Sequence, residues 1–136
     1  MRILITEWGW ESYGEMVGDQ FSKAEYWQTL RPDIERLFAL SSDAKFRDSK
    51  FWGPAESAAN KPVSDGYKMK WHNMGSGRIQ LRLGVVLIGP TAWLCHAWSK
   101  TKDAEDQRQC MALRHRITLI RAGQARIKGE IHERRT

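Results

Sequence analysis

The sequence predicts an α+β domain in which helices pack against one antiparallel sheet, and three observations support this prediction. Apolar and polar residues alternate over 67–73 and again over 78–83, which is the period of half-buried strands. The links between 67–73, 78–88 and 92–98 are too short for parallel crossovers, so these three strands form an antiparallel meander. Residues 33–40 and 103–122 carry apolar residues at helical spacing.

Length and composition favour one packed domain over residues 1–136. Hydrophobic residues make up 41% of the chain and charged residues 28%, which fits a globule and excludes a disordered chain. No secretory signal and no apolar run of about 20 residues is visible, which predicts a cytoplasmic protein with no membrane partner. Cys95 and Cys110 have no metal-ligand spacing and are expected in the core.

The N-terminal third is predicted as a strand followed by two helices. Residues 2–6 form a short β-branched run, and a helical turn or two follows from Trp8. Ser22 and Glu25 have the spacing of a capping box, which opens a helix. Pro32 suits the first turn of a second helix, or bends a single one.

The remaining segments complete a predicted order of β-α-α-β-β-β-α. Residues 41–66 contain Gly-Pro, Lys-Pro and Asp-Gly pairs and are interpreted as a long loop, whose Phe and Trp side chains clamp over the core. Gly84 marks a candidate bulge inside the second meander strand. Residues 103–122 form the longest helix, and 124–136 form a basic tail that either ends in a short strand or stays loose.

Charge is distributed unevenly along the chain. Residues 1–65 hold 8 Lys and Arg against 11 Asp and Glu, whereas residues 66–136 hold 14 against 5. The second half therefore carries an excess of +9, which favours a nucleic acid or an acidic protein as partner. A basic surface that serves only solubility is the plainer alternative.

The outward faces of the predicted meander carry the candidate functional groups. If the three strands turn the same face outward, their basic side chains build one groove. Cleavage of RNA without metal needs a proton acceptor for the 2′-OH, positive charge on the phosphate and an acid for the leaving oxygen. The candidate catalytic residues are His96, Arg82, Arg78, Lys100 and His72, and Lys68, Lys70 and Trp98 are the candidate RNA-binding residues.

Each of these candidates has a defined role and a plainer alternative. Arg78 and Arg82 would grip a phosphate, His96 and His72 would move protons, and Lys100 would neutralise developing charge. Trp98 would stack on a base, or it packs under the final helix beside a merely hydrogen-bonded His96. No metal-ligand cluster or phosphate-cradling glycine loop is apparent, so no cofactor is expected.

The order of elements resembles the RelE/ParE superfamily of type II toxin–antitoxin toxins, including its HigB-like, phage-derived branch. The resemblance lies in Tyr67-Lys-Met-Lys-Trp71, in Gly77-Arg-Ile-Gln-Leu-Arg-Leu83 and in Leu94-Cys-His-Ala-Trp-Ser-Lys-Thr101, within about residues 67–122. It implies a bacterial or phage toxin that a cognate antitoxin holds inactive. Many members are endoribonucleases that cut messenger RNA on the ribosome, while the ParE branch inhibits DNA gyrase without nuclease activity.

The resemblance also bears on the C-terminal tail. Residues near the C-terminus often complete the RNA site in this family, which implies a role for Arg126, Lys128 and His132. Several RelE-type nucleases carry a functional tyrosine there, but this chain has no tyrosine after Tyr67. A metal-free endoribonuclease is therefore the leading hypothesis, and a gyrase inhibitor or a plain nucleic-acid-binding domain are the alternatives.

Overall fold

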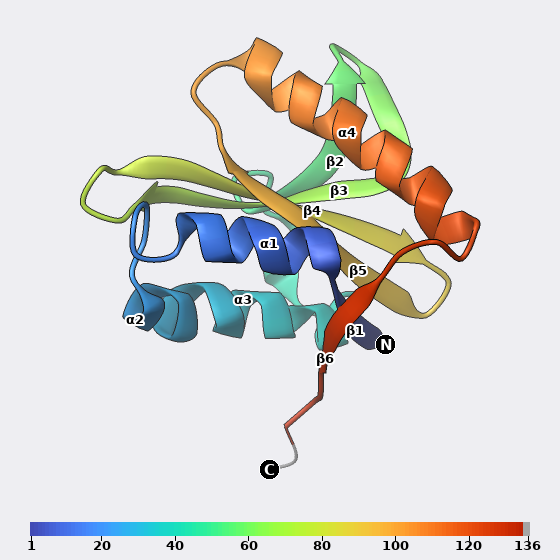
Figure 1. The fold of residues 1–136 in the computed structure, drawn as a ribbon, viewed down its shortest axis with the longest axis horizontal. Helices are drawn as coiled ribbons and strands as arrows, with labels where there is room; N and C mark the ends of the chain where they lie inside the picture. Colours follow the sequence, from blue (N-terminus) through green and yellow to red (C-terminus); the bar gives the residue numbers. More distant parts are fainter. Residues whose placement is uncertain (135–136) are drawn as a thin grey trace.

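A computed structural model of the chain describes residues 1–134, so the last two residues of the predicted basic tail lie outside it. One six-stranded sheet runs through the molecule in the order β2-β3-β4-β5-β1-β6 (Figure 1). Neighbouring strands are antiparallel except β1 and β5, which are parallel. The strands are β1 Arg2–Thr6, β2 Trp52–Ala58, β3 Lys61–Met74, β4 Ile79–Ile88, β5 Thr91–Ser99 and β6 Ile127–Ile131.

Helices cover both faces of this sheet, which confirms a mixed α+β fold. The helices α1 Glu7–Met16, α2 Lys23–Glu25 and α3 Arg31–Glu35 lie on one face, and α4 Asp103–Arg121 lies on the other. Two apolar cores result, because Val85 packs with the first set of helices and its neighbour Val86 packs with α4.

The predicted meander is confirmed as β3, β4 and β5. Met69 and Trp71 on β3 lie opposite Leu83 and Leu81 on β4, and all four side chains are buried on the α1–α3 side. The ladder between β4 and β5 shifts register between Gly84 and Val85, whose partners are His96 and Leu94, so the extra residue is Cys95 of β5 and the bulge predicted at Gly84 lies on the neighbouring strand. A side chain at Gly84 would meet Leu113 of α4 at 3.0 Å, so this glycine also lets α4 approach the sheet.

The prediction of a loop over 41–66 is wrong for most of its length. A 3-10 turn forms at Ala44–Arg47, and β2 then pairs with β3, which begins at Lys61 and is longer than predicted. Because β2 is an edge strand, it tolerates proline and glycine, which had indicated a loop. The expected aromatic clamp is confirmed, since Phe46 and Phe51 are buried in the first core.

The N-terminal strand β1 and the C-terminal strand β6 lie next to each other at the edge of the sheet opposite β2. β1 lies between β5 and β6, so the short N-terminal strand is internal, and Ile3 and Thr6 are fully buried. Residues 127–131 of the predicted tail form β6, antiparallel to β1. The parallel pairing of β1 with β5 corrects the expectation of a purely antiparallel sheet.

One nearly continuous helical segment runs from Lys23 to Glu35, with a π-helical turn at Tyr26–Leu30. Within this turn the Arg31 N–H donates to the carbonyl of Tyr26, five residues back. Pro32 explains the wide turn, because it has no N–H and its ring would clash with a carbonyl four residues earlier. Of the two predicted alternatives, two separate helices or one helix altered at Pro32, the structure agrees with the second.

The predicted capping box at the start of this segment is present. Ser22 accepts a bond from the Glu25 N–H, and the Glu25 carboxylate accepts bonds from the Ser22 and Gly75 N–H groups. These backbone hydrogen bonds hold the pKa of the Glu25 carboxyl below its usual range. The cap thus joins the helix to the turn between β3 and β4.

Ser22→Ala is expected to lower the free energy of unfolding by about 1 kcal/mol, because the helix loses one capped N–H group. Denaturant unfolding followed by circular dichroism measures this change. The control is Ser42→Ala, which removes an exposed hydroxyl that caps no helix and should change stability by less than about 0.5 kcal/mol. Equal effects of the two substitutions would contradict a stabilising role for the cap.

Candidate nucleic-acid interface

Three neighbouring strands present basic side chains on the sheet face that α4 partly covers. Lys70 of β3 lies opposite Arg82 of β4, which lies opposite Trp98 of β5, so these side chains share a face. Lys100 directly follows β5 and extends the pairing of β5 with β4, since its N–H donates to the Gln80 carbonyl at 2.7 Å. We call this set the cationic face: Lys68, Lys70, His72, Arg82 and Lys100.

Lys68 is held by an acidic residue from α4. Its Nζ lies 2.6 Å from Oδ2 of Asp106, and the two side chains are 12% and 7% exposed. Trp98 Nε1 donates to the other carboxylate oxygen at 2.9 Å. Burial raises the pKa of the Asp106 carboxyl, but the hydrogen bonds from Lys68 and Trp98 outweigh it and the pKa is lowered overall. Asp106 is therefore a buried anion beneath the cationic face.

Lys70 lies at the centre of the face. Its Nζ donates to the Ser49 carbonyl at 2.8 Å, and Gly53 leaves room for it, since a side chain there would approach Nζ to 3.4 Å. Burial, and then repulsion from Lys68 and Arg82, lowers the pKa of the Lys70 ammonium. A lowered pKa makes the neutral amine of Lys70 easier to form than that of an ordinary lysine, which is the direction that proton transfer requires.

His72 lies at the exposed end of β3, where both ring nitrogens meet oxygen atoms. Nδ1 lies 2.9 Å from the Gln80 Oε1, and Nε2 lies 2.6 Å from the Lys50 carbonyl. Gln80 is oriented by its own bond to Asn73. Contacts at both ring nitrogens fix the orientation of the His72 imidazole beside Gln80 and the Lys50 carbonyl.

The two arginines are not placed as the sequence predicts. Arg82 is only 6% exposed, and its Nη1 donates to the carbonyls of Leu81 and Trp71 at 3.1 and 3.4 Å. Arg78 precedes β4, in the turn after β3, with a φ of 52°. The positive φ breaks the alternation, so the two guanidinium groups do not form the predicted pair on one strand face.

His96 and Trp98 are on the predicted face but lie beneath α4. Both are 5% exposed, with ring centroids 5.1 Å apart, so neither stacks on a base or reaches a phosphate in this structure. Neither ring nitrogen of His96 makes a hydrogen bond of normal geometry among residues 1–134, although looser contacts with Gln109 of α4 act to raise its pKa. Burial, and then repulsion from Arg116, lowers the pKa of His96 to about 3. A neutral, enclosed imidazole is a poor candidate for proton transfer.

The basic residues of the tail are separate from this face. β6 is the far edge strand, and β5 and β1 lie between it and β4. Arg126 and Lys128 are exposed there, with Arg126 Nε 3.9 Å from the Glu7 carboxylate, and His132 is exposed after the strand ends. The implied contribution of Arg126, Lys128 and His132 to one RNA site does not match their position.

Sequence reasoning missed Asp106 as part of the site. Asp106 lies in the acidic first turn of α4, where a carboxylate also complements the helix dipole and needs no other explanation. A usable signal exists, because the buried positions of α4 follow one helical stripe and Asp106 begins it: Asp106, Cys110, Leu113, Ile117 and Ile120. An acid on an apolar stripe points to a partner beneath the helix. Cys95 and Cys110 are buried core residues, as predicted.

Comparisons with protein-family models, with curated proteins and with solved structures find no match to this chain. In the described part of the chain, no helix combines the length and the apolar character needed to cross a bilayer. Across the same residues, no three His, Cys, Asp or Glu side chains are grouped so that they could hold a metal ion.

Proposed function

We propose that this chain binds RNA through the cationic face and cleaves it without a metal ion, as the toxin of a RelE/ParE-like toxin–antitoxin pair. The observation that carries the proposal is that the five basic side chains of the cationic face share one side of β3, β4 and the end of β5, where the buried Asp106 carboxylate holds one of them, Lys68. The antitoxin would be an acidic or amphipathic protein that covers this face.

The charge balance of the face favours a polyanion. Asp106 neutralises Lys68, and the exposed Asp103 lies 3.1 Å from Lys100. When it is protonated, Lys70 has the Ser49 carbonyl and no carboxylate as partner among residues 1–134, which leaves its charge uncompensated. His72 lies beside it with oxygens at both ring nitrogens. Phosphates along a single strand would replace Asp103 at Lys100 and meet Lys70 and His72, with release of counterions.

Lys70 is the residue best suited to start the cleavage reaction. In the proposed step, its neutral amine takes the proton of a ribose 2′-OH, and the 2′-oxygen attacks the adjacent phosphorus. His72 and Lys100 stabilise the charge that develops on the phosphoryl oxygens. The bond from phosphorus to the 5′-oxygen breaks, that oxygen takes a proton from a cation of the face, and a 2′,3′-cyclic phosphate remains.

A non-enzymatic inhibitor of gyrase or of another protein is the second candidate. The burial of His96 and Arg82 favours it, because two of the groups expected to act on RNA have no access to a substrate. Under this candidate the same face would bind an acidic protein surface, and no RNA would be cut.

Exchange of Lys70 and Lys100 for methionine is expected to weaken binding of a single-stranded RNA by at least about tenfold. The slope of log K against log salt should fall by about 1.4, because two phosphate contacts are lost. Fluorescence anisotropy with a labelled 20-nucleotide RNA, measured over a salt series, gives both quantities. The matched control exchanges Arg126 and Lys128, which removes the same charge from the far edge of the sheet.

The cleavage step is tested in a bacterial translation extract by primer extension on a reporter messenger RNA. Cuts with wild-type protein that persist in the Arg126/Lys128 variant and vanish in Lys70→Met would support the proposal. If expression arrests growth while messenger RNAs stay intact and DNA is damaged, the gyrase inhibitor would replace the endoribonuclease as the proposed function. Equal RNA affinity of the two double variants would refute the cationic face as the binding surface.

A further inference from the structure

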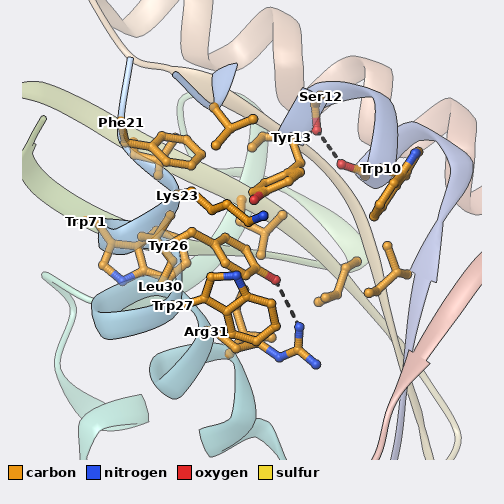
Figure 2. A pocket seen from close by; sticks show the side chains of 18 residues that line it. Trp10, Ser12, Tyr13, Phe21, Lys23, Tyr26, Trp27, Leu30, Arg31 and Trp71 are labelled. Atoms are coloured by element: carbon orange, nitrogen blue, oxygen red, sulfur yellow. Dashed lines mark hydrogen bonds between the residues drawn. The ribbon is translucent and has the colours of Figure 1, made fainter. Parts of the chain in front are cut away.

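A cavity of about 420 Å³ lies on the opposite face of the sheet, between α1, the helical segment that contains the π turn, and β3–β5. Figure 2 shows its lining, which is mostly aromatic and aliphatic. Leu81, Leu83 and Leu94 form its floor on the sheet, and Tyr13 and Tyr26 close it from the helices with ring centroids 4.7 Å apart. Its size is within the range of about 300–1,000 Å³ typical of small-molecule sites.

The π turn shapes this cavity. Tyr26, Trp27, Leu30 and Arg31 all line it, although they span more than one turn of helix. Positions i, i+1, i+4 and i+5 share one side of a helix, and the π turn lies within this stretch. Such turns occur frequently at functional sites. Here the turn supplies two aromatic rings and a guanidinium to the same opening.

Two tryptophans lie exposed at the rim. Trp10 of α1 is 55% exposed and Trp27 of the π turn is 48% exposed, on opposite sides of the opening (Figure 2). Large aromatic side chains left in water beside a cavity are typical of a ligand site, because a ligand that fills the cavity also covers them.

Two cations at the rim lack an acidic partner. Among residues 1–134, neither Arg31 nor Lys23 forms an ion pair. Arg31 Nη1 has only a 3.3 Å contact to the Tyr26 hydroxyl, its guanidinium carbon lies 4.9 Å from the Trp27 ring centroid, and its buried Nε has no hydrogen-bond partner. A carboxylate is the group that a free guanidinium fork binds best after phosphate.

We propose that this cavity binds a small amphipathic carboxylic acid, with an unbranched alkyl or aryl-alkyl body inside and its carboxylate on Arg31, assisted by Lys23. The apolar walls provide the affinity for the body, and the two cations select an anion over a neutral or cationic analogue. This site is independent of the RNA face, because Trp71 and Lys70 project from opposite sides of β3.

Calorimetry and tryptophan fluorescence with decanoate test the proposal, with decan-1-ol and decyltrimethylammonium as probes that change only the head group. Decanoate should bind one to one and at least about tenfold more tightly than either analogue, which is the fold-change expected for one charge-assisted hydrogen bond. Three of the chain's 7 tryptophans line the cavity, so the fluorescence should change on binding.

Two variants test separately how the ligand's carboxylate and its apolar body contribute to the affinity. Arg31→Met should weaken decanoate about tenfold and leave decan-1-ol unchanged, and Ala97→Leu, which fills the floor from β5, should weaken both. Arg114→Met on the exposed side of α4 is the charge-matched control. Equal affinity for decanoate and decan-1-ol, unchanged binding in folded Ala97→Leu, or no decanoate binding up to about 1 mM would overturn the proposal.

Discussion

Asp106→Asn is expected to lower the free energy of unfolding by about 3 kcal/mol. Asparagine keeps an oxygen that can accept the bond from Trp98 Nε1, but the substitution removes the buried negative charge that contacts Lys68. Lys68 is then left largely desolvated beside other cations, and its amine must either stay charged without a partner or lose its proton. Urea unfolding at pH 7 measures the loss.

Asp103→Asn is the matched control, because Asp103 belongs to the same helix turn but is 86% exposed in its contact with Lys100. An exposed ion pair contributes less than about 1 kcal/mol, so this variant should remain close to wild type. Combining Lys68→Met with Asp106→Asn should recover part of the lost stability, since no ammonium then remains without a partner. Equal loss in the two single variants would contradict the view that Asp106 anchors α4.

The meander was predictable because its strands follow the simplest local rule. β3 alternates apolar and polar residues along its length, and Arg78-Ile-Gln-Leu-Arg-Leu83 does the same at the start of β4, so the pattern identifies both strands and inner residues such as Met69 and Leu81, although the middle of β4 is buried on both faces. The capping box at Ser22 was equally local, because it depends on two residues three positions apart. Features set by neighbours in the sequence were therefore predicted correctly.

The edge strands were not predictable in the same way. β2 carries Gly53 and Pro54, whose partners on β3 are Lys68 and Tyr67, more than ten positions later. Pairing with a long neighbour compensates for poor local strand propensity, and local composition cannot reveal that. The parallel contact of β1 with β5 likewise joins residues about 90 positions apart, such as Ile3 and Ala92.

The sequence predicted which sheet face carries the candidate site, but it did not predict which residues on that face are open to solvent. Lys68, Lys70 and Lys100 lie on one face, as the alternation indicates. Which part of that face is open depends on where α4 crosses it, and this is a tertiary property. Helix α4 covers His96 and Trp98, so the plainer alternative for Trp98, packing under the final helix, is the one observed.

His96→Leu is the second large expected effect, and it appears as a change in pH dependence. His96 has a pKa of about 3 in the folded chain, against an ordinary value near 6.5 for the unfolded chain. Between these values the unfolded state binds a proton that the folded state does not, so the wild type loses stability as the pH falls below about 6.5. We expect His96 to account for a loss of about 2.5 kcal/mol by pH 4.5.

The leucine variant cannot take up that proton in the unfolded state, so its free energy of unfolding should be nearly flat from pH 7.5 to about 5.5. Below that range the carboxyls whose pKa is lowered in the folded chain, such as Glu25, reduce the stability of both proteins alike. At pH 7.5 it should lie within about 1 kcal/mol of wild type, because neither imidazole nitrogen gives up a hydrogen bond. His132→Gln removes an exposed histidine and should keep the wild-type slope. Denaturant unfolding at four pH values distinguishes these curves.

The same variant decides whether His96 takes part in cleavage. A general acid or base contributes about 10²- to 10⁴-fold to the rate, so loss of a catalytic His96 would abolish the cuts seen by primer extension. If Lys70 is the base, His96→Leu should cut RNA at the wild-type rate while Lys70→Met does not. A flat stability profile together with lost cleavage would instead require α4 to move away from β5 during the reaction, because only then could RNA reach the imidazole.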